Sequence, residues 1–222
     1  MIIVKRGIAS GSVSSLFIGK DAAFAAEGFT SQYQEILGKF PELRGLAYSE
    51  QVHGDRSFEI GETTEKLFFA GEGDALFTRI SRQALLIRTA DCIPILFYSP
   101  SQPLIGAVHA GWRGLKAKIL TKTLAAAGLG DDLEFIVGPC IGGKSYEVGS
   151  DVSSQFASAF SISKVQGKFL LDLRQVLESE FAELGVTPER IEWHDEDTLR
   201  TPEWYSARRG DTRRNLAVIF RV

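Results

Sequence analysis

Cysteine, histidine and methionine are scarce in this chain, and long apolar runs are missing. The 222 residues include two cysteines, three histidines and one methionine. Two cysteines in a chain of this size do not form a disulfide framework, so we expect a reduced, cytoplasmic protein. No apolar stretch approaches the roughly 18 residues of a membrane helix, and the first residues do not resemble a signal peptide. We therefore expect neither a membrane protein nor an exported one.

The composition is that of an ordinary globular chain. The net charge is −3 and the pI is about 5.7, which gives no electrostatic footprint for nucleic acid. Apolar residues make up 44% of the chain, and its length is sufficient to bury a core. We expect a single domain over residues 1–222; the sequence specifies no oligomeric state.

Short apolar segments bounded by turn residues predict buried strands at 46–52, 84–88, 93–98, 104–108, 133–137 and 215–220. Pro94 indicates that its strand lies at a sheet edge or begins there. Helical spacing predicts helices near 21–37, 115–128, 150–160 and 172–184. Strands and helices do not alternate strictly, so we expect an α+β fold with a mixed sheet rather than a doubly wound parallel sheet.

Two histidines and one cysteine follow apolar runs and stand next to glycine or a small residue: His53, Cys92 and His109. Two imidazoles and a thiolate suffice to bind zinc with an open fourth position, as in a catalytic site. Their spacing is not local, so spacing alone is weak evidence. The alternatives are a turn histidine at 53 that bonds a backbone carbonyl, and a buried, inert cysteine at 92.

Other polar residues stand next to these segments. Asp91 lies between apolar runs and needs a partner; it could orient a histidine ligand or carry a proton. Cys140 precedes a tight glycine turn, where packing near the site is favoured over a direct chemical role. His194 lies in an acidic turn and is expected to be structural or solvated.

Arginines form the one dense basic patch, at positions 208, 209, 213 and 214. Guanidinium groups pair with phosphate oxygens in a bidentate manner, so this patch predicts a phosphate clamp, with a solvated face as the alternative. The Gly-Trp-Arg-Gly segment after His109 opens a helix whose N-terminus could also receive an anion. We expect Arg113 to contribute to this positive surface.

Together these segments resemble a bacterial family of the YfiH and YlmD type. The motifs that carry the resemblance are QVH at 51–53, GDALFT at 73–78, TADCIP at 89–94, HAGWRG at 109–114, VGPCIG at 137–142, YEVG at 146–149 and YSARR at 205–209. The family was long labelled multicopper polyphenol oxidase or laccase-domain, and members are now described as zinc-dependent purine nucleoside phosphorylases.

The resemblance implies a compact α+β fold with sheets stacked between helix layers, and a zinc ion bound by His53, Cys92 and His109. It implies phosphorolysis of adenosine, inosine and methylthioadenosine, together with adenosine deaminase activity, so the partners would be purine nucleosides and phosphate. The residues that we predict for catalysis are Asp91, Cys92 and Arg113. Those that we predict for phosphate binding are Lys5, Arg6, Arg208 and Arg209.

Three positions depart from the family pattern. Lysine stands at position 5 where arginine is usual, unless Arg6 takes that role; Asp197 replaces a frequent cysteine, and Arg213 a glycine. These changes concern substrate preference and phosphate affinity rather than the metal ligands.

Other functions are also open at this point. A multicopper oxidase needs on the order of ten histidines, and a blue copper site often uses a methionine, yet the only methionine is Met1; copper is thus the less favoured metal. A Cys–His hydrolase, with Cys92 as nucleophile and His109 as base, could cleave an amide such as a cell-wall precursor. A zinc-stabilised binding module is the non-enzymatic alternative.

Overall fold

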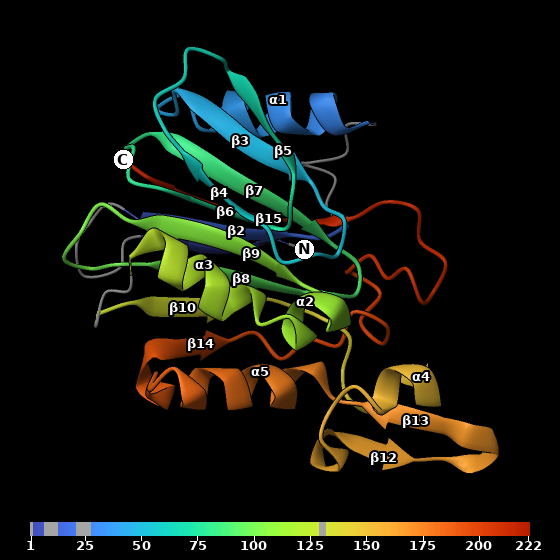
Figure 1. Cartoon of the computed structure of the whole chain (residues 1–222). Helices are drawn as coiled ribbons and strands as arrows, with labels where there is room; N and C mark the ends of the chain where they lie inside the picture. Colours follow the sequence, from blue (N-terminus) through green and yellow to red (C-terminus); the bar gives the residue numbers. More distant parts are fainter. Residues whose placement is uncertain (1, 7–12, 21–27, 129–131) are drawn as a thin grey trace.

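The computed structural model describes the chain except residues 1, 7–12, 21–27 and 129–131; the side chains of residues 2–6 and of residue 29 are also outside the description. Two six-stranded sheets lie face to face between layers of helices (Figure 1). One sheet has the order β1 (Ile2–Arg6), β2 (Val13–Ile18), β15 (Asn215–Arg221), β7 (Gln83–Thr89), β3 (Gly45–Glu50) and β5 (Leu67–Glu72). The other has the order β14 (Ile191–Trp193), β10 (Glu134–Val137), β8 (Ile93–Tyr98), β9 (Ile105–Ala110), β6 (Ala75–Thr78) and β4 (Ser57–Ile60).

Strand pairing in both sheets is mixed, which confirms the predicted α+β class. Strand β3 is parallel to β5 and β7, and β4 is parallel to β6, whereas β8 pairs with β9 in antiparallel fashion. Pro94 is the second residue of β8, which lies between β10 and β9. The strand therefore begins next to the proline, and the edge-strand alternative is wrong.

The central strands are apolar on both faces because a core lies on each side of them. In β15, Leu216, Val218 and Phe220 pack against helix α1 (Phe29–Lys39) on the outer face of the first sheet. Ala217 and Ile219 point to the other side, into the core between the two sheets. A strand that is buried on both faces reads as a continuous apolar run, as the sequence of this strand does.

Helices α2 (Trp112–Lys116), α3 (Ile119–Ala127) and α5 (Leu173–Glu183) cover the outer face of the second sheet (Figure 1). A three-stranded sheet of β11 (Glu147–Gly149), β13 (Lys168–Leu171) and β12 (Ser161–Ser163) lies beside them with the short helix α4 (Ser150–Ser153). Single 3-10 turns occupy residues 158–160, 165–167 and 188–190.

Three helix predictions need correction. The continuous helix expected over 115–128 is broken at Lys118, whose φ of 59° is left-handed. The buried Glu180 carboxylate then accepts hydrogen bonds from the backbone N–H and hydroxyl of Thr121, which caps α3 separately. The helix expected at 150–160 ends at residue 153, where Ser153 Oγ bonds Ser161 Oγ at 2.9 Å, and residues 158–160 form a 3-10 turn instead.

The third correction concerns the first helix. We expected a helix near 21–37, but α1 begins at Phe29, after Gly28 with a φ of 84°, and continues to Lys39. Residues 21–27 are outside the described part. The helix predicted at 172–184 is confirmed as α5. It begins after Asp172, whose carboxylate accepts hydrogen bonds from the backbone N–H groups of Arg174 and Gln175 and so caps the N-terminus.

Candidate metal centre

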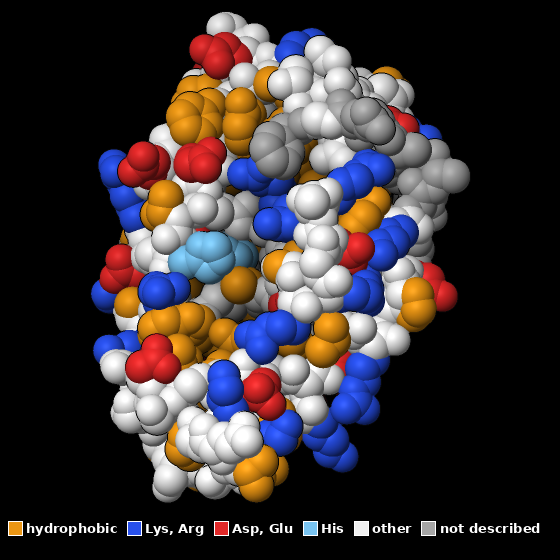
Figure 2. Space-filling view, turned by 90° about the vertical axis from the view of Figure 1, so that its right-hand side faces the viewer, with side chains coloured by type: hydrophobic (Ala, Val, Ile, Leu, Met, Phe, Trp, Pro, Cys, Tyr) orange, Lys and Arg blue, Asp and Glu red, His pale blue; other side chains and the backbone are white. Residues whose placement is uncertain are grey.

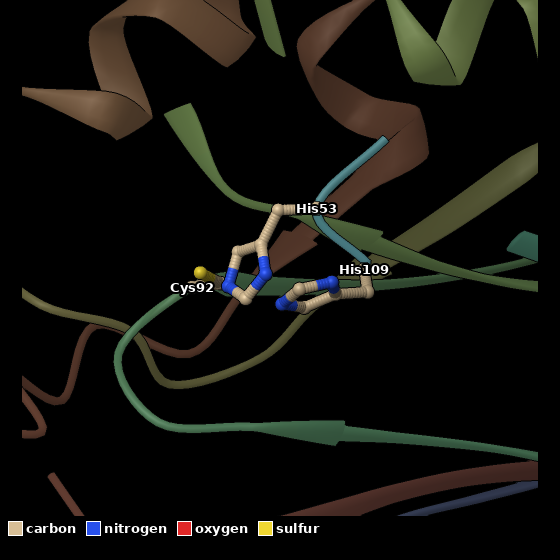
Figure 3. A group of neighbouring side chains, drawn as sticks. All are labelled: His53, Cys92 and His109. Carbon is tan, nitrogen blue, oxygen red and sulfur yellow. The ribbon is translucent and has the colours of Figure 1, made fainter. Parts of the chain in front are cut away.

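Three side chains from three separate segments converge at one end of the sheets (Figure 3). His53 comes from the loop after β3, Cys92 from the turn before β8, and His109 from β9. One nitrogen of each histidine and the cysteine sulfur all lie within 4.8 Å of one another. The two imidazole rings meet edge to face, with centroids 4.9 Å apart. The structure thus brings together the three residues that the sequence singled out.

Strand pairing explains why Cys92 and His109 are neighbours. Strands β8 and β9 are antiparallel, with Pro94 opposite His109 and Ile93 opposite Ala110. Cys92 precedes Ile93 directly, so the two strand ends carry the thiol and the imidazole to the same place. His109 is buried, Cys92 is partly buried and His53 is exposed. The group therefore opens to solvent on its His53 side.

His53 is positioned by a buried carboxylate. The backbone N–H groups of Val52, His53 and Gly54 donate to the Asp74 carboxylate at 3.2, 2.9 and 2.7 Å. Asp74 is fully buried. His53 has a φ of 60°, a left-handed conformation that a non-glycine residue seldom adopts. The loop therefore wraps around one carboxylate and presents the imidazole to Cys92.

The same carboxylate orients His109. Its Oδ1 lies 2.7 Å from His109 Nδ1, and the backbone N–H of His109 donates to the Asp74 carbonyl at 2.8 Å. Burial tends to raise the pKa of Asp74, but the hydrogen bonds from His109 and the loop outweigh it and lower the pKa. A carboxylate on the second ring nitrogen is the usual companion of a metal-binding histidine, because it fixes the ring orientation.

Sequence reasoning gave Asp74 no role. The available indication was an acidic residue directly before the apolar run 75–77, which needs a buried partner. The sequence offers Asp91 as a residue that could orient a histidine, but that alternative is wrong, because Asp74 holds His109. The Asp91 carboxylate accepts hydrogen bonds from Thr198 Oγ1 at 2.6 Å and from the Arg208 backbone N–H at 2.9 Å. Its role as a proton carrier stays a prediction.

Cys92 and His109 perturb each other's protonation. Burial acts to raise the pKa of Cys92, but the His109 charge and hydrogen bonds from both imidazoles lower it to about 6. Burial acts to lower the pKa of His109, but the Cys92 thiolate and Asp74 raise it to about 9. The environment therefore favours a thiolate, which is the form that metals and electrophiles both require.

Gly111 leaves room for the side chains of Cys92 and His53. A Cβ atom at this position would lie 2.9 Å from Cys92 Sγ and 3.1 Å from His53 Cδ2. The glycine of the His-Ala-Gly-Trp segment is therefore needed for space rather than for an unusual backbone angle, since its φ is −79°.

Two cavities flank the converging side chains. A cavity of about 470 Å³ lies on the histidine side, and its lining is Glu50, Gln51, His53, Arg88, Ala90, His109, Ala207, Thr212 and Arg214. A cavity of about 330 Å³ lies on the cysteine side, and its lining is Ala90, Asp91, Cys92, Ile141, Tyr146, Leu173, Ala207 and Arg208. Ala90 and Ala207 belong to both, so the two cavities share a wall.

Lysine and arginine side chains surround the histidines on this face (Figure 2). Arg208 lines the smaller cavity, with its guanidinium 5.2 Å from the centre of the Tyr146 ring. Arg113 is exposed and lies over Trp112, and its charge acts on Tyr146. The side chains of Lys5 and Arg6, also predicted to bind phosphate, are outside the described residues.

Arg209 is a correction to the predicted phosphate contacts. Its guanidinium donates to the carbonyls of Thr198, Leu199 and Trp204 and twice to the Asp211 carboxylate. These bonds use all five of its donors, so Arg209 ties the C-terminal loop together instead of facing a ligand.

The remaining cysteine and histidine lie away from the group. Cys140 is fully buried in the core, and its sulfur accepts a hydrogen bond from Arg174 Nε at 3.3 Å. This agrees with the expected packing role. His194 contacts the Phe17 ring edge to face, with centroids 5.4 Å apart, and lies 3.5 Å from the Glu192 carboxylate. It is structural, as expected, but only partly exposed.

The chain matches the model of a protein family described as multi-copper polyphenol oxidoreductase laccase over residues 5–221. A Xylella fastidiosa protein named purine nucleoside phosphorylase is 30% identical over 206 residues, covering 88% of this chain and 78% of that protein. Escherichia coli purine nucleoside phosphorylase YfiH is 33% identical over 178 residues, covering 76% and 70%. A Haemophilus influenzae protein named purine nucleoside phosphorylase is 32% identical over 161 residues, and the match spans only 64% of its length.

Solved structures share the fold over nearly the whole chain. A Neisseria meningitidis protein of the DUF152 family superposes with a TM-score of 0.82 at 24% identity, covering 99% of this chain and 98% of that one. YlmD from Geobacillus stearothermophilus superposes with a TM-score of 0.81 at 22% identity, covering 98% and 96%. These likenesses confirm the stacked α+β architecture.

Proposed function

Because this chain belongs to the multi-copper polyphenol oxidoreductase laccase family and is similar to proteins named purine nucleoside phosphorylase, we propose that it is a zinc-dependent purine nucleoside phosphorylase. Its substrates are adenosine, inosine and methylthioadenosine, and it also deaminates adenosine. The observation that carries the proposal is the convergence of His53, Cys92 and His109 between two cavities of substrate size.

The donor set fits zinc better than copper. One thiolate and two imidazoles leave a fourth position open, as catalytic zinc sites do, and Asp74 fixes one of the imidazoles. A multicopper oxidase needs on the order of ten histidines, and this chain has three. Bound zinc would lower the pKa of a coordinated water to about 7 and so make hydroxide available near neutral pH.

Deamination then needs a proton carrier. The water oxygen bonds to C6 of the purine, the C6–N6 bond breaks, and the amine leaves as ammonia with the proton of the attacking water. Asp91 lines the same cavity as Cys92, and each of its carboxylate oxygens accepts one hydrogen bond that holds it in place. We assign Asp91 to move that proton, a role that contributes about 10²–10⁴-fold in rate.

Phosphorolysis needs phosphate next to the sugar. A phosphate oxygen bonds to C1′ of the ribose while the C1′–N9 bond breaks, and its electron pair leaves with the base, which then takes up a proton. Arginines near the metal group hold the phosphate and stabilise its charge. Of the three that the sequence predicted within the described residues, Arg113 and Arg208 stay candidates, whereas Arg209 uses its donors inside the C-terminal loop.

The test is chromatography of reactions with zinc-loaded protein. Inosine should give hypoxanthine and ribose 1-phosphate only when phosphate is present, and adenosine should give inosine without phosphate. The matched control is Cys92→Ser, because it removes one ligand while both cavities remain. Wild-type protein with one bound zinc that leaves both nucleosides intact over long incubation would refute the proposal.

A Cys–His hydrolase is the second candidate, and one observation favours it. The Cys92 sulfur lies beside two imidazoles that lower its pKa to about 6, which also suits a nucleophile paired with His109 as base. Metal-free protein that cleaves an amide substrate and loses this activity on alkylation of Cys92 would support it. Stoichiometric zinc with no turnover of either substrate class would instead indicate a binding module.

We also propose a cytoplasmic location. Both cysteines are free thiols, which suits a reducing compartment. In the part of the chain that the structure describes, no helix has the length and apolar character needed to span a bilayer.

A further inference from the structure

A third cavity, of about 380 Å³, lies at the end of the sheets that is remote from the metal group, and its lining is Arg44, Glu62, Thr63, Thr64, Ile80, Ser81 and Gln83. Strand β7 begins at this cavity with Gln83 and ends at Thr89, shortly before Cys92. A strand rises by about 3.3 Å per residue, so the two ends of β7 are roughly 20 Å apart. The cavity is therefore separate from the metal group and from the two cavities beside it.

Backbone hydrogen bonds hold the walls of this cavity together. The N–H of Arg44 donates to the carbonyl of Arg82 at 2.8 Å, which joins the start of β3 to the turn between β6 and β7. The N–H of Leu46 donates to the carbonyl of Lys66 at 2.9 Å, which joins β3 to the loop between β4 and β5. Three segments thus form the cavity in fixed positions, and a ligand would enter a preformed site.

One wall of the cavity contains a buried amide. Gln83 is only 3% exposed. Its Nε2 donates to the Ala84 carbonyl at 3.4 Å, a long hydrogen bond, and its Oε1 accepts none from any described residue. The hydroxyls of Thr64 and Ser81 likewise have no hydrogen-bond partner in the part of the chain that the structure describes. A buried carbonyl oxygen without a donor is unfavourable, so Gln83 fits a ligand that carries N–H or O–H groups.

Arg44 and Glu62 bring opposite charges to the same cavity. Both residues are exposed, and neither has an ion-pair partner among the described residues. A simple anion would face the Glu62 carboxylate, and a simple cation would face the Arg44 guanidinium. A sugar would use neither charge. A zwitterion satisfies both, because a guanidinium group pairs with a carboxylate, and a carboxylate accepts hydrogen bonds from an ammonium group.

We propose that this cavity binds a free α-amino acid. The carboxylate of the amino acid pairs with Arg44, its ammonium group donates to Glu62 and to Gln83 Oε1, and its side chain lies beside Ile80. The inference goes beyond the proposed phosphorylase function, since binding here requires neither a metal ion nor a nucleoside.

The test is calorimetric titration of the zinc-loaded protein with each of the common protein amino acids. At least one should bind. The carboxylic acid and the amine that correspond to the best-binding amino acid should each bind about tenfold more weakly or worse, because each lacks one charge-assisted contact. Glucose is the neutral probe. The proposal is overturned if no amino acid binds, or if glucose or either analogue binds as tightly as the amino acid.

Two pairs of variants place the ligand in the cavity. Arg44→Gln and Glu62→Gln should each weaken binding of the amino acid about tenfold or more. Arg82→Gln and Glu65→Gln are the matched controls, because these exposed residues lie in the same turn and the same loop but do not line the cavity. Affinity should be unchanged in both controls. An equal loss there would indicate a general effect of surface charge and would exclude the site.

Removal of the metal separates this cavity from the metal group, since zinc itself attracts the amine and carboxylate of an amino acid. Wild-type protein treated with a chelator should bind the amino acid as tightly as the zinc-loaded protein does. Loss of binding with the metal would place the amino acid on zinc and overturn the proposal. Nucleoside turnover enters none of these measurements, so a failure of the proposed phosphorylase function would leave this result unaffected.

Discussion

The two cysteines have similar neighbours, but the pKa of one thiol is lowered and that of the other is raised. Cys92 lies beside His109, which is paired with the Asp74 carboxylate at 2.7 Å. Its pKa is lowered to about 6. Cys92 thus has a basic side chain next to it, and that side chain has a carboxylate partner; the same is true of Cys140.

At the second cysteine, Arg174 Nε donates to Cys140 Sγ, and the Arg174 guanidinium is ion-paired with Asp195. Complete burial nevertheless raises the pKa of Cys140 to about 11, since it outweighs the attraction of the Arg174 charge. At Cys92 burial is also the largest single effect, but two imidazoles together exceed it. A basic neighbour is therefore not sufficient to activate a thiol; at Cys92 two imidazoles together outweigh the burial that prevails at Cys140.

The largest expected effect concerns Cys92 itself. Cys92→Ser should lose zinc and both nucleoside activities, because a hydroxyl is a far poorer zinc ligand than a thiolate. The loss in metal affinity should exceed the roughly 10–100-fold that removal of an outer-sphere partner costs. Zinc per chain, measured by atomic emission after dialysis, checks this.

Cys140→Ser is the matched control for the same substitution at the other cysteine. It should retain about one zinc per chain, because its sulfur faces Arg174 and the core. Equal zinc contents in Cys92→Ser and wild type would contradict the ligand assignment and support the nucleophile.

A smaller effect is expected at Asp74. Asp74→Asn keeps the shape but removes the charge that pairs with His109 Nδ1 and accepts from the His53 loop. We expect zinc affinity to fall about 10–100-fold, as for other carboxylates that orient histidine ligands. Competition with a zinc-binding dye measures this without reference to activity. Asp132→Asn is the control, because the Asp132 carboxylate holds the Ser99–Ser101 turn; an equal fall there would exclude a specific role for Asp74.

Local patterns in the sequence predicted six of the strands and the three converging residues. The apolar run at 215–220 is buried on both faces as β15, and His53, Cys92 and His109 lie in or next to strand ends that meet. Such patterns succeed because a strand that is covered on both faces has an uninterrupted apolar sequence, which can be read directly.

Features that depend on distant contacts could not be predicted. Asp74 binds both the His53 loop and His109, which come together only in the folded chain. Arg209 donates to backbone carbonyls, and a sequence does not indicate which carbonyls lie near an arginine. The break at Lys118 carries no glycine or proline as an indication. The cavity that contains Arg88 and Arg214 is likewise formed by residues from separate segments.

The smallest expected effect is on the stability of the core and concerns Cys140. Cys140→Ala removes a fully buried sulfur, leaves a small void and deprives Arg174 Nε of its acceptor. Arg174 keeps its bonds to Asp195 and to the His194 carbonyl, so the free energy of unfolding should fall by only about 1–2 kcal/mol. Urea unfolding should show a lower midpoint with an unchanged slope, and zinc affinity should stay within about twofold of wild type. Loss of zinc at an unchanged midpoint would mean that the Cys140 side of the molecule contributes to the metal centre, and the distinction between the two cysteines would no longer hold.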